Sequence, residues 1–287
     1  MGIKVIILDV DGTLFSSEKC MLPKTKQALI KAQEMGIKVI LASGRPTSGL
    51  VDIAKELRMD QHHGLFVSYN GSKIIDCATS ETLFNEPLSI AEGQAVLEHM
   101  KNFDVKPMID KGHHMYVNNV YECYIKYQGK DFNIIEYEAR GGNYLLCEQN
   151  DLATFLDYEV NKILTAADPE YIDAHQDAMA APFKESLNCV QTAPFFYEFT
   201  AKGIDKAKAL DTVLKPLGYI EDDMIAFGDG MNDLTMLQYV GTGVAMGNAV
   251  DEVKAKAQYV TASNDEEGIA LALYKYMPEL QDSYRQG

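Results

Sequence analysis

The sequence predicts an α/β protein, a Rossmann-like core with a parallel sheet into which an α+β cap domain is inserted. Two observations carry this prediction. Short apolar runs alternate with amphipathic segments in residues 1–82 and again in 202–287, as expected of strand–helix units in a parallel sheet. Between them, residues 83–201 contain several strand-like runs in succession instead of strict alternation.

The two core segments consist of short strands that alternate with helices. In residues 1–82, strands are predicted for 3–8, 37–42 and 65–69, and helices for 23–35 and 46–57. Gly36 marks the end of the first of these helices, and Pro46 opens the second in its first turn. In residues 202–287, helices are predicted for 206–217, 233–239 and 268–276, and strands for 224–227, 242–246 and 258–261.

The inserted segment opens with a helix. Ser89 and Glu92 have the spacing of a capping box, which predicts a helix from Ser89 to about residue 103. A further helix is predicted from Asp168. Strands are predicted for 106–109, 115–117, 160–166, 187–191 and 195–199.

Charge and cysteine content restrict the partners. The 287 residues carry a formal net charge of −16, which disfavours nucleic acid, because clustered Lys and Arg bind its phosphates. A small anionic substrate could then bind only where a metal or a local lysine reverses the negative electrostatic potential of the acidic chain. Five scattered cysteines without CxxC spacing indicate reduced thiols in a cytoplasmic protein. No signal peptide or membrane-spanning run is recognisable, so we expect no membrane partner, and a monomer or small homo-oligomer.

Three apolar runs each end in a group of polar residues. Because ligands of open parallel sheets bind outside the carboxyl ends of the strands, these groups would meet in one crevice if their strands are neighbours. The three groups are Asp9-Val-Asp11-Gly12-Thr13, Ser43-Gly44-Arg45-Pro46 and Asp229-Gly-Met-Asn232-Asp233.

The first group places two carboxylates, Asp9 and Asp11, at a strand end, with Gly12 available for a tight turn. One carboxylate can bind a metal and act as a nucleophile, while the other lies one step further round the loop. An ordinary strand-to-turn junction is the alternative. A calcium-binding loop fails, because it needs Gly at its sixth position, whereas Gly12 is the fourth residue from Asp9.

The other groups supply metal and phosphate ligands. Asp9 and Asp229 with one backbone carbonyl would suit Mg²⁺, which prefers a few protein oxygens, although a helix N-cap also explains the acidic residues of the third group. Ser43 and Gly44 offer a hydroxyl and an N–H near a helix start, where phosphate binds, although a plain turn explains them equally. A surface position is the default for any single lysine, but Lys206 opens a helix at the end that disfavours positive charge, which slightly favours a special role.

Together these segments resemble the haloacid-dehalogenase superfamily, and within it the Cof-type subgroup (subclass IIB) of sugar-phosphate phosphatases, which carry a large cap of the C2 type. The resemblance covers nearly the whole chain. DVDGTL and GDGMNDLTML are specific in this order and at this distance, whereas ASGRP and GIDKAKAL are weaker. The stretches VAMGNA and TASNDEEGIA are similar to the C-terminal signature of the subgroup. Ala207 and Gly230 depart from residues frequent in the family, and neither change removes a catalytic group.

The resemblance implies a role for each group. Asp9 would be the nucleophile and Asp11 the general acid and base. Mg²⁺ would be held by the Asp9 and Asp229 carboxylates and the Asp11 carbonyl, with support from Asp233. The remaining residues implied are Ser43, Gly44 and Lys206 for the phosphoryl group, Asn232 in the same pocket, and Arg45, Asn70 and Gly71 on the substrate side.

The predicted function is Mg²⁺-dependent hydrolysis of small phosphomonoesters, such as sugar phosphates, through an aspartyl phosphate. A phosphomutase or phosphotransferase that uses the same Asp9 is one alternative, and a non-catalytic metal- or phosphate-binding regulator is another. Residues 83–201 supply no phosphate-handling residue, so we expect them to act as a cap that selects the substrate. Lys162 could meet a polar substrate there, but we expect it to be exposed.

Overall fold

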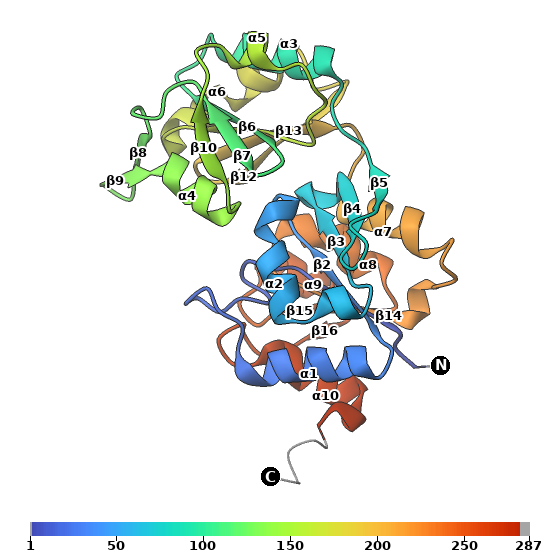
Figure 1. Cartoon of the computed structure of the whole chain (residues 1–287). Coiled ribbons are helices and arrows are strands. Elements are labelled where there is room, and N and C mark those ends of the chain that lie inside the picture. Colours follow the sequence, from blue (N-terminus) through green and yellow to red (C-terminus); the bar gives the residue numbers. More distant parts are fainter. Residues whose placement is uncertain (1, 282–287) are drawn as a thin grey trace. The chain divides into compact units, whose positions relative to one another are not determined.

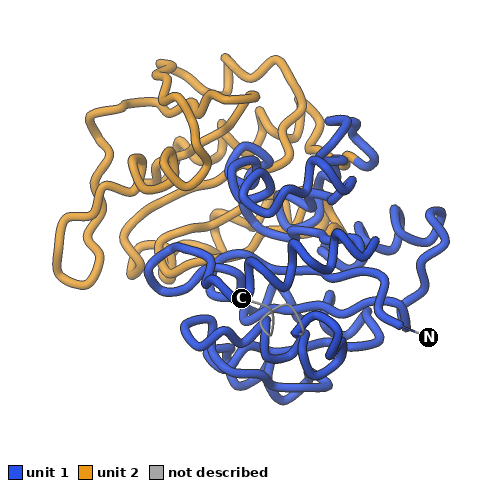
Figure 2. The backbone as a smooth tube through the Cα atoms, turned by 60° about the horizontal axis from the view of Figure 1, so that its bottom comes forward, with its two compact units in different colours: residues 1–84, 205–287 blue, residues 85–204 orange. Residues whose placement is uncertain are grey.

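The computed structural model describes residues 2–281. The chain divides into two compact units, unit 1 with Met1–Phe84 and Asp205–Gly287, and unit 2 with Asn85–Ile204 (Figure 2). Unit 2 is thus inserted between the two chain segments of unit 1. Each unit has its own sheet and its own apolar core.

Unit 1 is built on a sheet whose eight described strands have the order β16-β15-β14-β1-β2-β3-β4-β5. The strands from β16 to β3 pair in parallel, which confirms the predicted fold class. Their bounds are β1 (Val5–Leu8), β2 (Lys38–Ala42), β3 (Leu65–Ser68), β14 (Met224–Gly228), β15 (Thr242–Ala245) and β16 (Tyr259–Val260). Because β14 and β2 flank β1, the strand ends that precede Asp229, Asp9 and Ser43 are adjacent.

Two strands that the sequence pattern did not predict follow β3. The strand β4 (Lys73–Asp76) pairs antiparallel with β3, and β5 (Thr82–Asn85) lies beside β4. The chain reverses at Tyr69–Gly71, where all three residues have positive φ. This tight reversal leaves too few residues for the helix that a further parallel strand would need.

Helices cover both faces of the unit 1 sheet (Figure 1). Alternation along β1 sends Ile6 and Leu8 into one apolar cluster and Val5 and Ile7 into the other. The first cluster includes side chains of α1 (Pro23–Glu34), α2 (Val51–Glu56) and α10 (Gly268–Tyr276). The second includes side chains of α7 (Lys206–Leu214), α8 (Leu234–Tyr239) and α9 (Asp251–Lys256).

Two predicted helices of unit 1 need correction, and one further helix was not predicted. The single helix expected over 46–57 is wrong, because a 3-10 turn at Thr47–Gly49 is separated from α2 at Leu50. Here Thr47 Oγ1 bonds Ser68 Oγ at 2.8 Å, and Gly49 disfavours a continuous helix. The helix expected over 206–217 ends at Leu214, and α9 was not predicted. Further 3-10 turns span Met59–Gln61, Glu221–Asp223, Met231–Asp233 and Pro278–Leu280.

Unit 2 is an α+β unit with a six-stranded sheet in the order β10-β7-β6-β11-β13-β12. Its strands are β6 (Lys106–Lys111), β7 (His114–Val117), β10 (Leu145–Glu148), β11 (Ile163–Ala166), β12 (Leu187–Ala193) and β13 (Phe196–Ala201). One apolar cluster includes side chains of the helices α3 (Ile90–Met100), α5 (Leu152–Phe155) and α6 (Pro169–Ala180). A second apolar cluster includes side chains of α4 (Ile134–Gly141) and of the β8–β9 hairpin (Tyr124–Tyr127, Lys130–Asn133). The hairpin, β10, α4 and α5 were not predicted.

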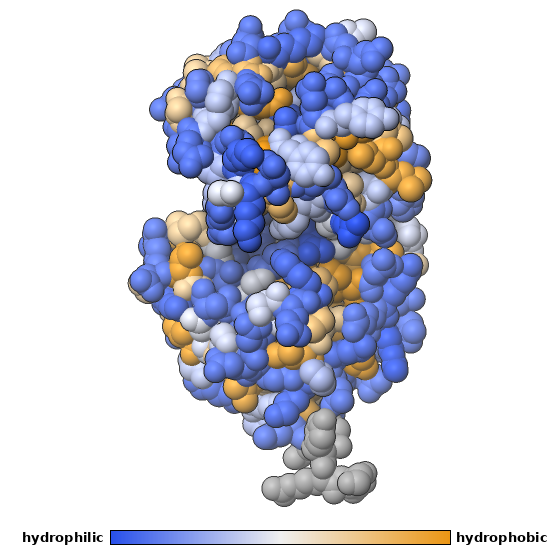
Figure 3. Space-filling view, turned by 90° about the vertical axis from the view of Figure 1, so that its left-hand side faces the viewer, coloured by the Kyte–Doolittle hydropathy of each residue, from blue (hydrophilic) through white to orange (hydrophobic). Residues whose placement is uncertain are grey.

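The described surface has few extended apolar areas. On the face shown in Figure 3, hydrophilic residues predominate and hydrophobic residues form several separate groups. The large exposed apolar side chains, such as Tyr121, Leu145 and Leu217, lie on different segments. Within residues 2–281, no helix combines the length and hydrophobicity that a bilayer crossing requires.

Lys162 was expected to be exposed, and this expectation is wrong. The residue precedes β11, is 7% exposed, and donates from Nζ to Glu198 Oε1 at 3.1 Å, while Glu198 is 5% exposed. Burial would lower the pKa of Lys162, but Glu198, Glu138 and Asp110 raise it above its usual value. An ammonium buried beside several carboxylates stays charged, and its loss leaves Glu198 without its principal partner.

We expect Lys162→Met to destabilise the protein by about 3–5 kcal/mol, because it leaves the Glu198 carboxylate buried without its lysine. The double variant Lys162→Met/Glu198→Leu should regain most of that loss, since two apolar residues of similar volume replace the pair. Urea unfolding of the three proteins measures both effects. Equal stability of the single variant and the wild type would contradict a structural role for this ion pair.

Candidate active site

Lys206 lies at the centre of the candidate site. It begins α7, is fully buried, and donates from Nζ to Asp9 Oδ1 at 2.7 Å and to Asp233 Oδ1 at 2.6 Å. Burial alone would lower the pKa of Lys206, but the charges of Asp233 and Asp9, and the hydrogen bonds to them, raise it above its usual value. The ammonium is therefore charged at neutral pH and joins three separate chain segments.

Asp9 follows β1 directly and is 5% exposed. Its N–H donates to Phe227 O at 3.0 Å, so the pairing of β1 with β14 continues to the carboxylate itself. Burial is the main cause that raises the pKa of Asp9 well above its usual range, and Asp233 and Asp229 add to the rise while Lys206 opposes it. A further cation beside Asp9 would favour its ionised form.

Asp229 follows β14 and faces the loop after Asp9. Thr13 Oγ1 donates to Asp229 Oδ1 at 2.7 Å, and burial is the main cause that raises the pKa of Asp229 to about 6. Gly12 has a φ of +81°, and a Cβ built on it would lie 2.4 Å from Asp229 Oδ2. Only glycine fits this close approach between the two loops.

The carboxylates of Asp9, Asp229 and Asp233 form a set of oxygen ligands. One oxygen of each lies within 4.8 Å of the others, the one such group found among residues 2–281. Asp233 uses both of its oxygens, Oδ1 for Lys206 and Oδ2 for the N–H groups of Asp229 and Gly230 at 3.0 and 2.9 Å. Within the same described residues, Asp9 Oδ2 and Asp229 Oδ2 accept no hydrogen bond.

Three carboxylates against one buried ammonium leave an excess of negative charge. Hard oxygen ligands with such an excess fit a divalent cation such as Mg²⁺. Asp9 and Asp229, which have unused oxygens, are the residues placed to hold it, whereas Asp233 orients the loop that carries Asp229.

The Asp11 carboxylate lies outside this group and is bound by cations of its own. Arg45 donates to it from Nε at 2.7 Å and from Nη2 at 2.8 Å, and Lys19 from Nζ at 3.2 Å. The Arg45 guanidinium carbon also lies 5.4 Å from the centre of the Phe15 ring. Burial would raise the pKa of Asp11, but Arg45 and Lys19 lower it below its usual value. Asp11 is therefore ionised in this conformation.

The remaining predicted residues lie at neighbouring strand ends of the same sheet. Ser43 is buried, and its Oγ accepts from the Arg45 N–H at 3.2 Å. Asn70 donates its N–H to Ser43 O at 2.9 Å, and its Oδ1 accepts from Asn232 Nδ2 at 3.0 Å. A Cβ on Gly44 would lie 3.1 Å from the amide nitrogen of the Asn70 side chain.

Gly71 fixes the start of α7. A Cβ at Gly71 would lie 2.4 Å from Asp205 O, and the residue has a φ of +106°. The turn at Tyr69–Gly71 therefore packs against the backbone that leads into Lys206. All predicted site residues thus lie in unit 1, and hydrogen bonds or close approaches connect them.

Sequence reasoning missed two residues that hold these loops. Thr13 binds Asp229, and Asn248 donates from Nδ2 to Gly12 O at 2.8 Å. Thr13 lies within the DVDGTL segment, so its place beside two carboxylates was a signal. Asn248 lies within VAMGNA, and no spacing rule links that segment to Gly12.

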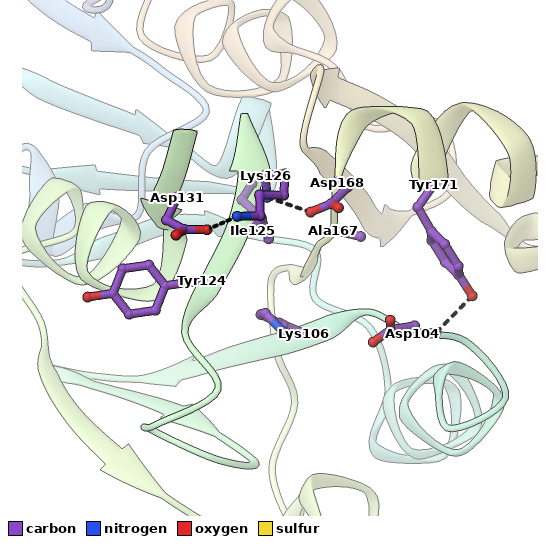
Figure 4. Close-up of a pocket in the computed structure, with 9 residues that line it drawn as sticks. All are labelled: Asp104, Lys106, Tyr124, Ile125, Lys126, Asp131, Ala167, Asp168 and Tyr171. Atoms are coloured by element: carbon purple, nitrogen blue, oxygen red, sulfur yellow. Dashed lines mark hydrogen bonds and ion pairs between the residues drawn. The ribbon is translucent and has the colours of Figure 1, made fainter. Parts of the chain in front are cut away.

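Unit 2 contains a separate pocket of about 240 Å³ (Figure 4). Charged residues and tyrosines line it, among them Lys106, Lys126, Asp168 and Tyr171. Several of these groups already bind one another, since the Lys126 N–H donates to Asp168 Oδ1 at 2.6 Å and Tyr171 Oη accepts from the Asp104 N–H at 2.8 Å. None of the predicted site residues lines this pocket.

Comparison with known proteins places the chain in a family. The family model for haloacid dehalogenase-like hydrolases matches residues 6–273. A haloacid dehalogenase-like hydrolase from Bacteroides thetaiotaomicron has a crystal structure with a TM-score of 0.87 and 34% identity, covering 95% of this chain and 99% of that one. A subclass IIB sugar phosphatase of known structure has a TM-score of 0.78 and 25% identity, covering 95% of this chain and 98% of that one. The pyridoxal phosphate phosphatase of Escherichia coli is 26% identical, with 96% of this chain and 100% of that protein covered.

The chain belongs to the haloacid dehalogenase-like hydrolase family, because the family model spans nearly its whole length. The resemblance drawn from the sequence is confirmed. Several of its relatives are named phosphatases, and the chain is an enzyme of this class.

The raised pKa values of Asp229 and Asp9 predict an unusual pH dependence for the metal-free protein. A carboxyl whose pKa is higher in the folded state, here about 6 for Asp229 against a usual 3.8, binds its proton more tightly when folded. The free energy of unfolding, measured in chelator, should therefore increase as the pH falls from 7.5 to 5. Saturating Mg²⁺ should flatten this trend, since the ions hold the carboxylates ionised.

Calorimetric Tm values at several pH values, with chelator or with Mg²⁺, measure the effect. Asp229→Asn should reduce the trend in chelator, and should raise the Tm at pH 7.5 by a few degrees, because it removes one charge from the group. A metal-free wild type whose Tm falls steadily from pH 7.5 to 5 would contradict the assignment.

Proposed function

We propose that this enzyme hydrolyses small phosphomonoesters in a Mg²⁺-dependent reaction in which Asp9 is transiently phosphorylated. The observation that carries the proposal is the buried Lys206, which binds the Asp9 carboxylate within a group of three carboxylates. One carboxylate next to a fixed ammonium, with room for a divalent cation, provides both a nucleophile and a positive field for a phosphoryl group.

In the first step an Asp9 oxygen attacks phosphorus, and the bond between phosphorus and the leaving oxygen breaks. Asp9 has two carboxylate oxygens, of which Oδ1 accepts from Lys206, so one oxygen can attack while the other stays with the cation. Mg²⁺, held by Asp9, Asp229 and the Asp11 carbonyl, would neutralise charge on the phosphoryl oxygens. Ser43, Gly44 and Asn232 lie at adjacent strand ends and would orient these oxygens.

Asp11 would donate its proton to the leaving oxygen, and then take a proton from the water that attacks the aspartyl phosphate. This second attack breaks the bond between phosphorus and Asp9, releases phosphate and restores the carboxylate. Since Arg45 and Lys19 keep Asp11 ionised in this conformation, proton donation requires the Asp11 side chain to leave them and to take up a proton from water first.

The substrate class we propose is a phosphorylated small metabolite, with sugar phosphates as the leading candidates. The related subclass IIB sugar phosphatase and the pyridoxal phosphate phosphatase support small phosphomonoesters in general. The scattered free cysteines support a cytoplasmic enzyme, which we propose acts as a monomer or small homo-oligomer. A phosphotransferase would use the same Asp9, and the two reactions differ in whether water or a second sugar accepts the phosphoryl group.

Asp9→Asn keeps the shape of the side chain but removes the attacking charge, so turnover should fall by at least about 1000-fold while the fold is retained. Phosphate release from a set of phosphorylated metabolites measures turnover, and circular dichroism checks the fold. Excess chelator should abolish wild-type activity, and Mg²⁺ should restore it. Activity of Asp9→Asn within about tenfold of the wild type would remove Asp9 from this role.

We also propose that unit 2 is the cap that selects the substrate. None of the residues assigned to phosphoryl transfer lies between Asn85 and Ile204, although this segment is far longer than a plain connection. The transfer residues are therefore common to any phosphomonoester, and discrimination must come from contacts with the leaving group.

Replacing residues 85–204 with a short linker should leave a protein that still gains stability from Mg²⁺ but discriminates poorly among phosphoesters. The ratio of kcat/KM for the best metabolite to that for p-nitrophenyl phosphate should fall by at least about tenfold. If a folded variant of this kind keeps the wild-type ratio, selectivity resides in unit 1.

A further inference from the structure

We infer that Asn248 is a positioning residue that holds the nucleophile loop, residues 9–15, at a fixed distance from the loop that carries Asp229. The inference rests on the proposed function, because it concerns the alignment of the proposed metal and phosphate ligands. Asn248 itself contacts none of the carboxylates, and it acts through the backbone of Gly12.

Both ends of the Asn248 side-chain amide are engaged. Its Nδ2 donates to Gly12 O at 2.8 Å, and its Oδ1 accepts from the Asn264 N–H at 3.0 Å. The second hydrogen bond orients the amide, so that the nitrogen and not the oxygen faces the Gly12 carbonyl. Aspartate, with two acceptor oxygens, could make only the contact with Asn264.

The segment that contains Asn248 also binds the Asp229 loop. The Val250 N–H donates to Asp229 O at 3.1 Å, and the Met246 N–H donates to Gly228 O at 3.0 Å. Residues 246–250 therefore bond the backbone of both carboxylate-bearing loops. The side chain of Asn248 makes the bond to the nucleophile loop, whereas backbone groups make the bonds to the Asp229 loop.

A second contact supports the same loop further along. Asn264 Nδ2 donates to Phe15 O at 2.8 Å, and the Ser17 N–H donates to Asp265 Oδ1 at 2.8 Å. The C-terminal segment thus holds the chain at two carbonyls, those of Gly12 and Phe15. Asn264 connects the two contacts, since its N–H orients Asn248.

Positioning matters at Gly12 because the loops approach so closely there. A Cβ at Gly12 would lie 2.4 Å from Asp229 Oδ2, so the loop has little room to move toward Asp229. Within residues 2–281, Asn248 is the residue that donates to the Gly12 carbonyl. The Asp11 carbonyl, our proposed third metal ligand, belongs to the peptide directly before Gly12. Loss of the Asn248 donor frees the next peptide, Gly12–Thr13, to rotate, and the Asp11 carbonyl can then shift with it. Small displacements of aligned groups reduce the rate strongly.

The test compares Asn248→Ala with Asn102→Ala in the full chain. Asn102 is a matched control, since it too donates from Nδ2 to a backbone carbonyl, that of His99 at 2.9 Å, but lies in unit 2. Mg²⁺ binding is measured by titration calorimetry without substrate, and kcat and KM with p-nitrophenyl phosphate. For Asn248→Ala we expect the Kd for Mg²⁺ to rise at least threefold and kcat to fall about tenfold, with KM within about threefold.

The metal titration keeps this test separate from that of the proposed function, because it needs no turnover. A Kd for Mg²⁺ and a kcat that both match those of Asn102→Ala would overturn the inference. If Asn248→Ala lowers the Tm by more than about 3 °C, Asn248→Asp replaces it, since this variant keeps the acceptor for Asn264 and loses only the donor to Gly12. The same fall in kcat is then expected, and an unchanged kcat overturns the inference.

Discussion

The ammonium of Lys206 between Asp9 and Asp233 is the interaction on which the arrangement of unit 1 depends. A fully buried lysine is tolerated only where carboxylates compensate it, because the loss of hydration costs several kcal/mol per ion. The two bonds therefore hold α7 against the ends of β1 and β14. Asp233 extends the constraint, since its other oxygen accepts the N–H groups of Asp229 and Gly230.

The charges of the buried side chains in this arrangement do not balance. One ammonium faces three carboxylates, and the pKa values of Asp9 and Asp229 are raised as a result of burial and mutual repulsion. The metal-free protein is therefore less stable at neutral pH than it would be with balanced charges, and a bound divalent cation would offset this loss. In the proposed reaction, one lysine and one bound cation would together supply the local positive charge that an anionic phosphoryl group needs in a chain with a net charge of −16.

The sequence predicted those features that depend on continuous apolar runs. Strands buried on both faces, such as β1 and β14, are apolar throughout, and this pattern placed Asp9 and Asp229 at strand ends. Their convergence was expected only if the strands are neighbours, and the structure shows that β1 and β14 pair. The contacts that lock the loops were not predictable, because Thr13 and Asn248 bind residues 216 and 236 positions away. The β8–β9 hairpin was missed because its short strands lack an alternating pattern, and Lys162 was misjudged because its partner Glu198 lies on another strand.

Backbone strain at the site follows from the same requirement for close loops. Tyr69 and Asn70 adopt left-handed conformations, which cost non-glycine residues about 1–3 kcal/mol each, and Gly71 follows with a positive φ. The conformation brings the Asn70 amide between Gly44 and Asn232 and packs Gly71 on the backbone before Lys206. A relaxed turn would separate the strand end that carries Ser43 from Lys206. The strain is therefore maintained by hydrogen bonds to Ser43 and Asn232, and it keeps the turn against both the strand end that carries Ser43 and the backbone that leads into α7.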